Sequence, residues 1–149
     1  MDKVIIITGP TAVGKTKCSI GVAKHFNTEI INGDAYQIYK HMNIGTAKPS
    51  LEEMSKVNHH LIDFIDPSEA FSVTDYQRIV RGKITEFKEK NLMPLIVGGS
   101  GLYIESVICN YTFDGKTRDL SFEEKFKDYS NEELHNYLKQ LSCNDAEEI

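Results

Sequence analysis

No stretch of this 149-residue chain is apolar for long enough to cross a bilayer, which takes about 20 consecutive apolar residues. The amino terminus also lacks the basic and then apolar segments of a secretory signal peptide. It runs instead as a short apolar segment into a glycine-rich loop. We therefore expect a cytoplasmic protein that has no membrane partner.

Cysteine is scarce as well. The three cysteines are odd in number, widely separated and outside any C-x-x-C or metal-ligand spacing; they are Cys18, Cys109 and Cys143. This pattern excludes a disulfide framework and predicts reduced thiols that take no part in a metal site.

The chain has little net charge, a formal −5, and that charge is unevenly placed. Nine acidic residues and three lysines lie between Asp119 and Ile149, whereas the preceding residues carry 14 basic and 13 acidic side chains. The acidity is therefore local to the last part of the chain. The electrostatically neutral main body leaves a nucleic-acid partner possible on charge grounds.

The most specific pattern follows the first predicted strand, Val4–Thr8. It is G-x-x-x-x-G-K-[ST], the phosphate-binding P-loop of nucleotide- and ATP-binding proteins. Its backbone N–H groups wrap a diphosphate, the Lys15 ammonium neutralises the outer oxygens, and the Thr16 hydroxyl is placed to ligate Mg²⁺. A chance glycine-rich turn is the weaker alternative, because a helix is predicted to open at about Gly14 with its positive end toward the same anion. The candidate phosphate-binding residues are Gly9, Pro10, Thr11, Ala12, Val13, Gly14, Lys15 and Thr16.

Predicted strands alternate with predicted helices over the first 107 residues, and the length and composition of the whole 149-residue chain suit one globular domain. The strands are Val4–Thr8, Glu29–Asn32, His59–Ile65 and Met93–Val97. The helices are Lys17–Phe26, a short helix from near Leu51, and a long helix with its N-cap at Thr74. This alternation predicts an α/β fold with a parallel sheet flanked by helices, similar to that of P-loop NTPases.

Two features follow the predicted ends of strands, where ligands bind in open α/β sheets. Asp34 comes two residues after the second strand, and either a site carboxylate or a turn-forming Asp fits there. The turn from Gly98 to Ser100 follows the fourth strand and offers the Ser100 hydroxyl. Between them, the residues 34–49 have no steady period and predict a loop-rich binding surface. The adjacent His59 and His60 point to opposite faces of a strand, which disfavours a shared metal ion.

The pattern changes after Asn110. Residues 111–129 read as a connector, and Ser130 to Glu133 form a capping box that starts an amphipathic helix. We therefore expect a P-loop core over residues 1–110, and a connector with the start of a helical insertion domain over residues 111–149.

Five blocks of the sequence together resemble the tRNA dimethylallyltransferase family. They are Gly9–Thr16, Asp34–Gln37, Asn43–Pro49, His59–Asp63 and Val97–Tyr103. These enzymes transfer the dimethylallyl group of dimethylallyl diphosphate to N6 of the adenosine next to the anticodon, at position 37 of a tRNA. The resemblance implies that the P-loop holds the diphosphate leaving group with Mg²⁺.

The resemblance also implies roles for single residues. Thr11, Lys15 and Thr16 bind the diphosphate and its Mg²⁺, Asp34 is the general base, and Ser100 contacts substrate. Gln37 hydrogen-bonds the extruded base, and Asp34, Ala35, Tyr36, Gln37 and Ser100 together contact the tRNA anticodon loop.

Three departures from the family pattern stand out. Ala35 replaces the usual Ser, and Arg118 is the one candidate for a substrate-contacting Arg beyond the glycine-rich turn. Family members also continue well beyond residue 149, so the chain resembles their amino-terminal half. We expect such a chain to be an impaired catalyst, with a sheet edge and apolar residues, among them Ile79, Val80, Phe87, Leu138 and Leu141, that lack part of their cover.

Three other functions fit the P-loop. An adenylate isopentenyltransferase uses free AMP or ATP as the acceptor, a small-molecule P-loop kinase transfers a phosphoryl group, and a non-catalytic fragment only binds diphosphate weakly or folds in part. The blocks Asn43–Pro49 and Val97–Tyr103 favour tRNA prenylation over the kinase.

Overall fold

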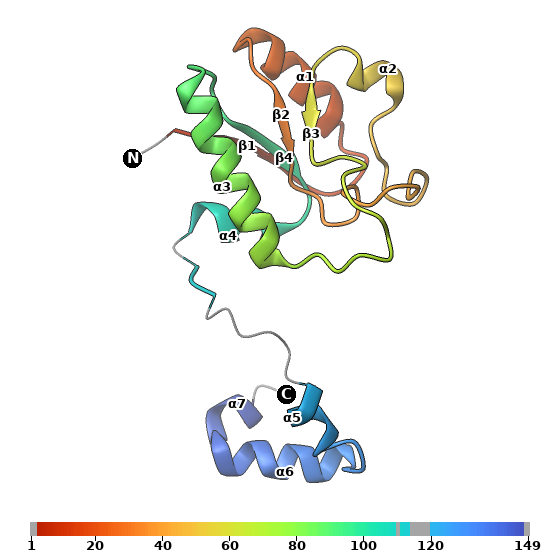
Figure 1. Ribbon diagram of the computed structural model, residues 1–149, viewed down its shortest axis with the longest axis vertical. Coiled ribbons are helices and arrows are strands. Elements are labelled where there is room, and N and C mark those ends of the chain that lie inside the picture. The colour runs from red at the N-terminus through yellow and green to blue at the C-terminus, as the bar shows by residue number, and fades with distance from the viewer. Residues whose placement is uncertain (1–2, 110, 114–119, 148–149) are drawn as a thin grey trace. The chain divides into compact units, whose positions relative to one another are not determined.

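The computed structural model describes residues 3–109, 111–113 and 120–147. The chain divides into two units, Met1–Thr112 and Phe113–Ile149 (Figure 1). The first unit contains a parallel sheet with helices on both faces, and the described residues of the second unit form short helices.

The sheet of the first unit has four parallel strands in the order β1-β4-β2-β3. Their bounds are Ile5–Thr8 for β1, Ile30–Asn32 for β2, His59–His60 for β3 and Leu95–Gly98 for β4. Because all four run the same way, their carboxyl ends meet at one edge of the sheet. The predicted α/β fold with a P-loop NTPase-like parallel sheet is confirmed.

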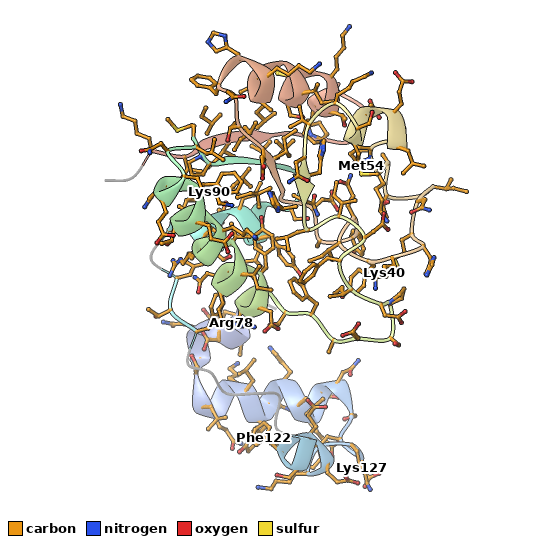
Figure 2. The ribbon with its side chains drawn as sticks, turned by 45° about the horizontal axis from the view of Figure 1, so that its top comes forward. Lys40, Met54, Arg78, Lys90, Phe122 and Lys127 are labelled. Atoms are coloured by element: carbon orange, nitrogen blue, oxygen red, sulfur yellow. The ribbon has the colours of Figure 1, made fainter. Side chains whose placement is uncertain are left out.

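Helices cover the two faces of this sheet (Figure 1). Helix α1 (Lys15–His25) packs on one face, while α3 (Val73–Glu89) and α4 (Gly101–Ile108) pack on the other. Neighbouring strand residues alternate between these faces, so Ile30 joins the core under α1 and Ile31 joins the core under α3 and α4. Burying one such isoleucine contributes about 1.5–3 kcal/mol. Figure 2 shows the side chains that fill these layers, with Arg78 in α3 and Lys90 just past its end.

The third predicted strand is much shorter than expected. It ends at His60, and Leu61 and Asp63 have left-handed backbones with φ of 61° and 50°. The apolar run to Ile65 predicts a strand, but a buried irregular segment carries the same apolar residues as a buried strand. Here Leu61 and Ile65 are buried from irregular backbone, and only an isolated bridge joins Tyr39 to Ile65.

Of two helices predicted from their capping residues, one begins where expected and the other begins earlier. Ser50 and Glu53 form the expected capping box and begin α2 (Leu51–Met54). The N-cap of α3 is Ser72, two residues before the predicted Thr74. The Ser72 hydroxyl accepts a hydrogen bond from the Asp75 amide, and the Asp75 carboxylate accepts one from the Ser72 amide. The other boundaries differ by one or two residues, which is the usual fraying of element ends.

The backbones at the carboxyl ends of β2 and β4 contact each other. A Cβ atom added at Gly98 would lie 2.0 Å from the carbonyl carbon of Gly33, so only glycine allows this approach. The amide of Ser100 donates to the carbonyl of Gly33 at 3.1 Å. The ends of β2 and β4 are thereby held together beside the P-loop.

The described part of the second unit contains α5 (Leu120–Glu124), α6 (Asn131–Leu141) and α7 (Cys143–Glu147). Its centre is Phe126, whose ring lies 4.9–5.3 Å from the rings of Phe122, Tyr129 and Tyr137. The capping box of Ser130 and Glu133 begins α6 as predicted. Helix α5 lies within the residues 111–129 that the sequence pattern predicts to be a connector, and a helix of five residues is too short to show a clear period in sequence.

The expectation of uncovered apolar residues is wrong for part of its set. Val80 and Phe87 are 0% and 2% exposed, and Ile79 packs against the same core. Their cover comes from the sheet and from α4, which lie within the first 109 residues. In the second unit Leu141 is 67% exposed.

Among the described residues, no helix combines the length and hydropathy that a membrane span requires.

Candidate functional site

The P-loop joins β1 to α1 and has the backbone that a phosphate nest needs. Gly14 has a φ of 89°, in the left-handed region that favours glycine, and Ala12 has a φ of 67°. The Lys15 ammonium lies back over the loop and donates to the carbonyls of Gly9 at 2.8 Å and Pro10 at 2.7 Å. The positive charge of Lys15 is thus held against the backbone of the loop.

Asp34 begins the turn that follows β2. Its Oδ1 accepts the amides of Tyr36 at 2.9 Å and Gln37 at 3.3 Å, so the turn-forming interpretation holds. A Cβ added at Gly99 would lie 3.7 Å from Asp34 Oδ2 and 3.5 Å from the Gly9 carbonyl. The second carboxylate oxygen therefore lies beside the glycine-rich turn and the P-loop, and both interpretations of Asp34 are compatible.

Asn32, the last residue of β2, holds the backbone of Asp34 from both sides. Its Oδ1 accepts the Asp34 amide at 3.0 Å, and its Nδ2 donates to the carbonyls of Asp34 and Leu61, both at 3.0 Å. The side chain is 2% exposed, so these bonds are shielded from water. Sequence reasoning missed this residue; the available signal was a polar amide that ends an otherwise apolar buried strand.

Ser100 and Gln37 each bind backbone groups. The Ser100 hydroxyl accepts from the Ala35 amide at 2.8 Å, and its own proton remains available to a ligand. The Gln37 Nε2 donates to the carbonyls of Thr46 at 3.0 Å and Ala47 at 3.3 Å. The predicted loop-rich surface thus folds back onto the turn that carries Asp34.

Two cavities open at this edge of the sheet. The smaller one, of about 30 Å³, has Ile30, Ile62 and Val97 among its lining residues, and the larger one, of about 260 Å³, lies between the P-loop and the residues Thr46, Ala47 and Glu53. Four residues line both cavities: Lys15, Thr16, Asp34 and Gln37. The two cavities therefore share an ammonium, a hydroxyl, a carboxylate and an amide.

His59 lines the smaller cavity, and burial lowers the pKa of its imidazole. Its Nδ1 lies 2.8 Å from the Val57 carbonyl, whereas the Nε2 of His60 contacts Glu29. The two rings therefore have separate partners. Within the described ranges, no three His, Cys, Asp or Glu side chains gather as a metal cluster.

The predicted site residues fall into three groups. Thr11, Ala12, Gly14, Lys15, Thr16, Asp34 and Gln37 line the cavities. Gly9 and Pro10 accept hydrogen bonds from the cavity-lining Lys15, and Ala35 and Ser100 are hydrogen-bonded to each other, whereas Val13 and Tyr36 are 61% and 67% exposed. Arg118 lies outside the described residues. Thr16 can supply one hydroxyl to Mg²⁺, an ion that commonly takes one or two protein ligands and completes its shell with phosphate oxygens and water.

Comparison with known proteins finds relatives over nearly the whole chain. A family model described as IPP transferase matches residues 37–149. A tRNA dimethylallyltransferase of Bacillus velezensis is 55% identical over 130 residues, covering 87% of this chain and 41% of the relative. One from Bacillus subtilis is 50% identical over 145 residues, covering 97% and 46%. The chain thus spans less than half the length of these two curated relatives.

Solved structures of similar sequence share the fold. The full-length tRNA isopentenylpyrophosphate transferase of Bacillus halodurans superposes with a TM-score of 0.74 at 43% identity, over 100% of this chain and 50% of that one. A eukaryotic dimethylallyltransferase acting on tRNA superposes with a TM-score of 0.84 at 26% identity, over 100% of this chain and 38% of that one. The parallel sheet, the sequence relatives and the family model agree, and the chain belongs to the IPP transferase family.

Proposed function

We propose that this protein transfers the dimethylallyl group of dimethylallyl diphosphate to N6 of an adenosine next to the anticodon, at position 37 of a tRNA. The observation that carries the proposal is the set of four residues, Lys15, Thr16, Asp34 and Gln37, shared by the two cavities. It combines a diphosphate-binding loop, a carboxylate and an amide within one site. The names of the relatives support the same reaction class.

The diphosphate is assigned to the P-loop. Its amides and the Lys15 ammonium neutralise the charge that develops on the leaving oxygen as the allylic C–O bond breaks. Lys15 exchanges its present acceptors, the Gly9 and Pro10 carbonyls, for phosphate oxygens. A Mg²⁺ ion held by Thr16 supplies further charge neutralisation to the diphosphate when bound.

The acceptor is assigned to the Asp34 side of the site. The exocyclic amine of adenine is a weak nucleophile, so a carboxylate that removes its proton lowers the barrier. The N6 nitrogen forms its bond to the first carbon of the dimethylallyl group, diphosphate departs, and the proton passes to Asp34 Oδ2. Oδ1 stays with the amides of Tyr36 and Gln37, which keeps the carboxylate in place during the reaction.

A transfer assay tests this function. Dimethylallyl diphosphate labelled in the allyl group is offered with anticodon stem-loop RNA, AMP or ATP as acceptors. Both the 149-residue chain and a version extended with the carboxyl-terminal part of the Bacillus velezensis relative are assayed, because the chain spans 41% of that protein. The variant Asp34→Asn is the matched control.

Label in the RNA with the wild-type residue, and its loss with Asp34→Asn, is the expected result. Label in AMP or ATP in place of RNA assigns the adenylate isopentenyltransferase reaction. Phosphoryl transfer from ATP assigns a kinase. No product from either length of chain contradicts the proposed function.

A further inference from the structure

The ammonium of Lys48 is buried and fully occupied. The Lys48 side chain is 3% exposed, and its Nζ lies 2.8 Å from the Tyr39 carbonyl, 3.0 Å from Asn43 Oδ1 and 2.7 Å from Asp63 Oδ1. An ammonium has three protons, so these three acceptors use all of them. A charge withdrawn from water in this way is retained only where its partners are well placed.

These three acceptors come from separate parts of the chain. Tyr39 follows the turn that begins at Asp34, Asn43 lies in the loop itself, and Asp63 follows β3. The Asp63 amide also donates to the carbonyl of Gln37 at 3.3 Å. Lys48 therefore joins the two ends of the segment of residues 39–48, here called the 39–48 loop. It also connects this loop to the segment that follows β3. Lys40 and Met54, labelled in Figure 2, mark the region of this loop and the following helix α2.

The 39–48 loop controls the orientation of Gln37. The carbonyls of Thr46 and Ala47, the two residues directly before Lys48, accept both bonds from Gln37 Nε2. The Thr46 hydroxyl donates to the Met42 carbonyl at 2.5 Å and stiffens the same loop. With its amide hydrogens occupied, Gln37 has only Oε1 to offer a ligand in the cavities that it lines.

We propose that Lys48 is a positioning residue that, by holding the Thr46 and Ala47 carbonyls against Gln37, makes this side chain present an acceptor oxygen to the base. The inference rests on the proposed function. An acceptor oxygen pairs with the exocyclic amine of adenine and opposes the carbonyl oxygen at the same place in hypoxanthine or guanine. Lys48 would thus determine which purine is bound while touching neither the base nor the diphosphate.

The test compares Lys48→Met with Lys56→Met in the extended chain. Lys56 forms an exposed ion pair with Glu52 on α2. Lys56→Met therefore removes the same charge as Lys48→Met but leaves the contacts of the 39–48 loop in place. Asn43→Ala, which removes one acceptor of the Lys48 ammonium, provides a milder variant if Lys48→Met folds poorly. Each protein is assayed for KM and kcat with adenosine stem-loop RNA, for inhibition by the matching inosine stem-loop, and for affinity toward pyrophosphate with Mg²⁺.

For Lys48→Met we expect KM for the RNA to rise about 2–10-fold, the loss that a single weakened hydrogen bond to the bound base produces. The preference for the adenosine over the inosine stem-loop should fall about tenfold, while kcat and pyrophosphate affinity change little. Asn43→Ala should move the same quantities in the same direction by less, and Lys56→Met should match the wild type. Unchanged KM and base preference in Lys48→Met, or an equal loss of pyrophosphate affinity, would overturn the inference.

Hydrogen exchange on the 149-residue chain separates this inference from the proposed function. Backbone amides of the 39–48 loop should exchange faster in Lys48→Met than in Lys56→Met, with no change in α1 or α3. Unchanged exchange in the loop refutes the positioning role even if prenyl transfer is observed. Faster exchange confined to the loop supports that role even if the wild type transfers a prenyl group to no acceptor.

Discussion

The Ser100 hydroxyl accepts a 2.8 Å hydrogen bond from the Ala35 amide and so joins two turns that are 65 residues apart. Ser100→Ala leaves that partly buried amide without its acceptor and should lower the free energy of unfolding by about 1–3 kcal/mol. Ser100→Thr keeps the hydroxyl and should stay within about 0.5 kcal/mol of the wild type. Urea unfolding of the 149-residue chain measures both. Equal stability of the Ala and wild-type proteins would show that this bond contributes nothing.

Lys15→Ala should weaken binding of pyrophosphate or dimethylallyl diphosphate with Mg²⁺. The loss expected for one charge-assisted hydrogen bond is about 1.5–3 kcal/mol, or roughly 10–150-fold in Kd. Lys24→Ala, in the last turn of α1, removes an equal charge far along the same helix and should have little effect. Calorimetry measures the affinities. An unchanged Kd for Lys15→Ala would remove the P-loop from diphosphate binding.

Asp34→Asn keeps an oxygen that can accept the Tyr36 and Gln37 amides, so the turn should persist. It removes the charge that accepts a proton, and we expect turnover of the extended chain to fall by about 10²–10⁴-fold. Diphosphate affinity should be nearly unchanged, because the P-loop is intact. Wild-type turnover of Asp34→Asn would show that Asp34 is not the base. A loss of diphosphate affinity that exceeds the loss of turnover would show the same.

Gly98 and Gly82 form a contrasting pair. A Cβ at Gly98 would lie 2.0 Å from the Gly33 carbonyl carbon, whereas a Cβ at Gly82 in α3 meets nothing within 4 Å. Gly98→Ala should destabilise the fold by about 3 kcal/mol or more, because backbone must move. Gly82→Ala should stabilise it by roughly 0.5–1 kcal/mol through helix propensity. Urea midpoints that move in the same direction for both variants would contradict this packing.

His59 should give the fold a pH dependence near neutrality. Burial lowers the pKa of His59 below its ordinary value of about 6.5, so the unfolded chain binds a proton first as the pH falls. The free energy of unfolding should therefore decrease from about pH 7 downward and level off below the lowered pKa. Denaturant titrations at several pH values measure this slope. His59→Gln should reduce it, whereas His25→Gln, at an exposed position, should leave it in place.

Several parts of the fold could be predicted because their causes are local. The capping boxes at Ser50 and Ser130 lie within four residues of sequence, and both are present. The P-loop could be recognised because its glycine, lysine and threonine positions follow one strand at fixed spacing. Other parts depend on distant partners. Ser72 rather than Thr74 caps α3, and both residues carry a suitable hydroxyl, so only the path of the chain into the helix decides between them.

The sequence by itself determined the alternation of strands and helices and the parallel sheet, since local propensity and apolar spacing dictate them, and it marked the P-loop by residues at a fixed spacing. Only the tertiary structure decided that β1 lies at the end of the strand order, that β3 stops at His60, and that Asn32 and Lys48 support the site. The physical reason is that a buried amide or ammonium must find hydrogen-bond partners wherever the folded chain supplies them. Those partners lie up to 29 residues away for Asn32 and 15 for Lys48, beyond the reach of any local pattern.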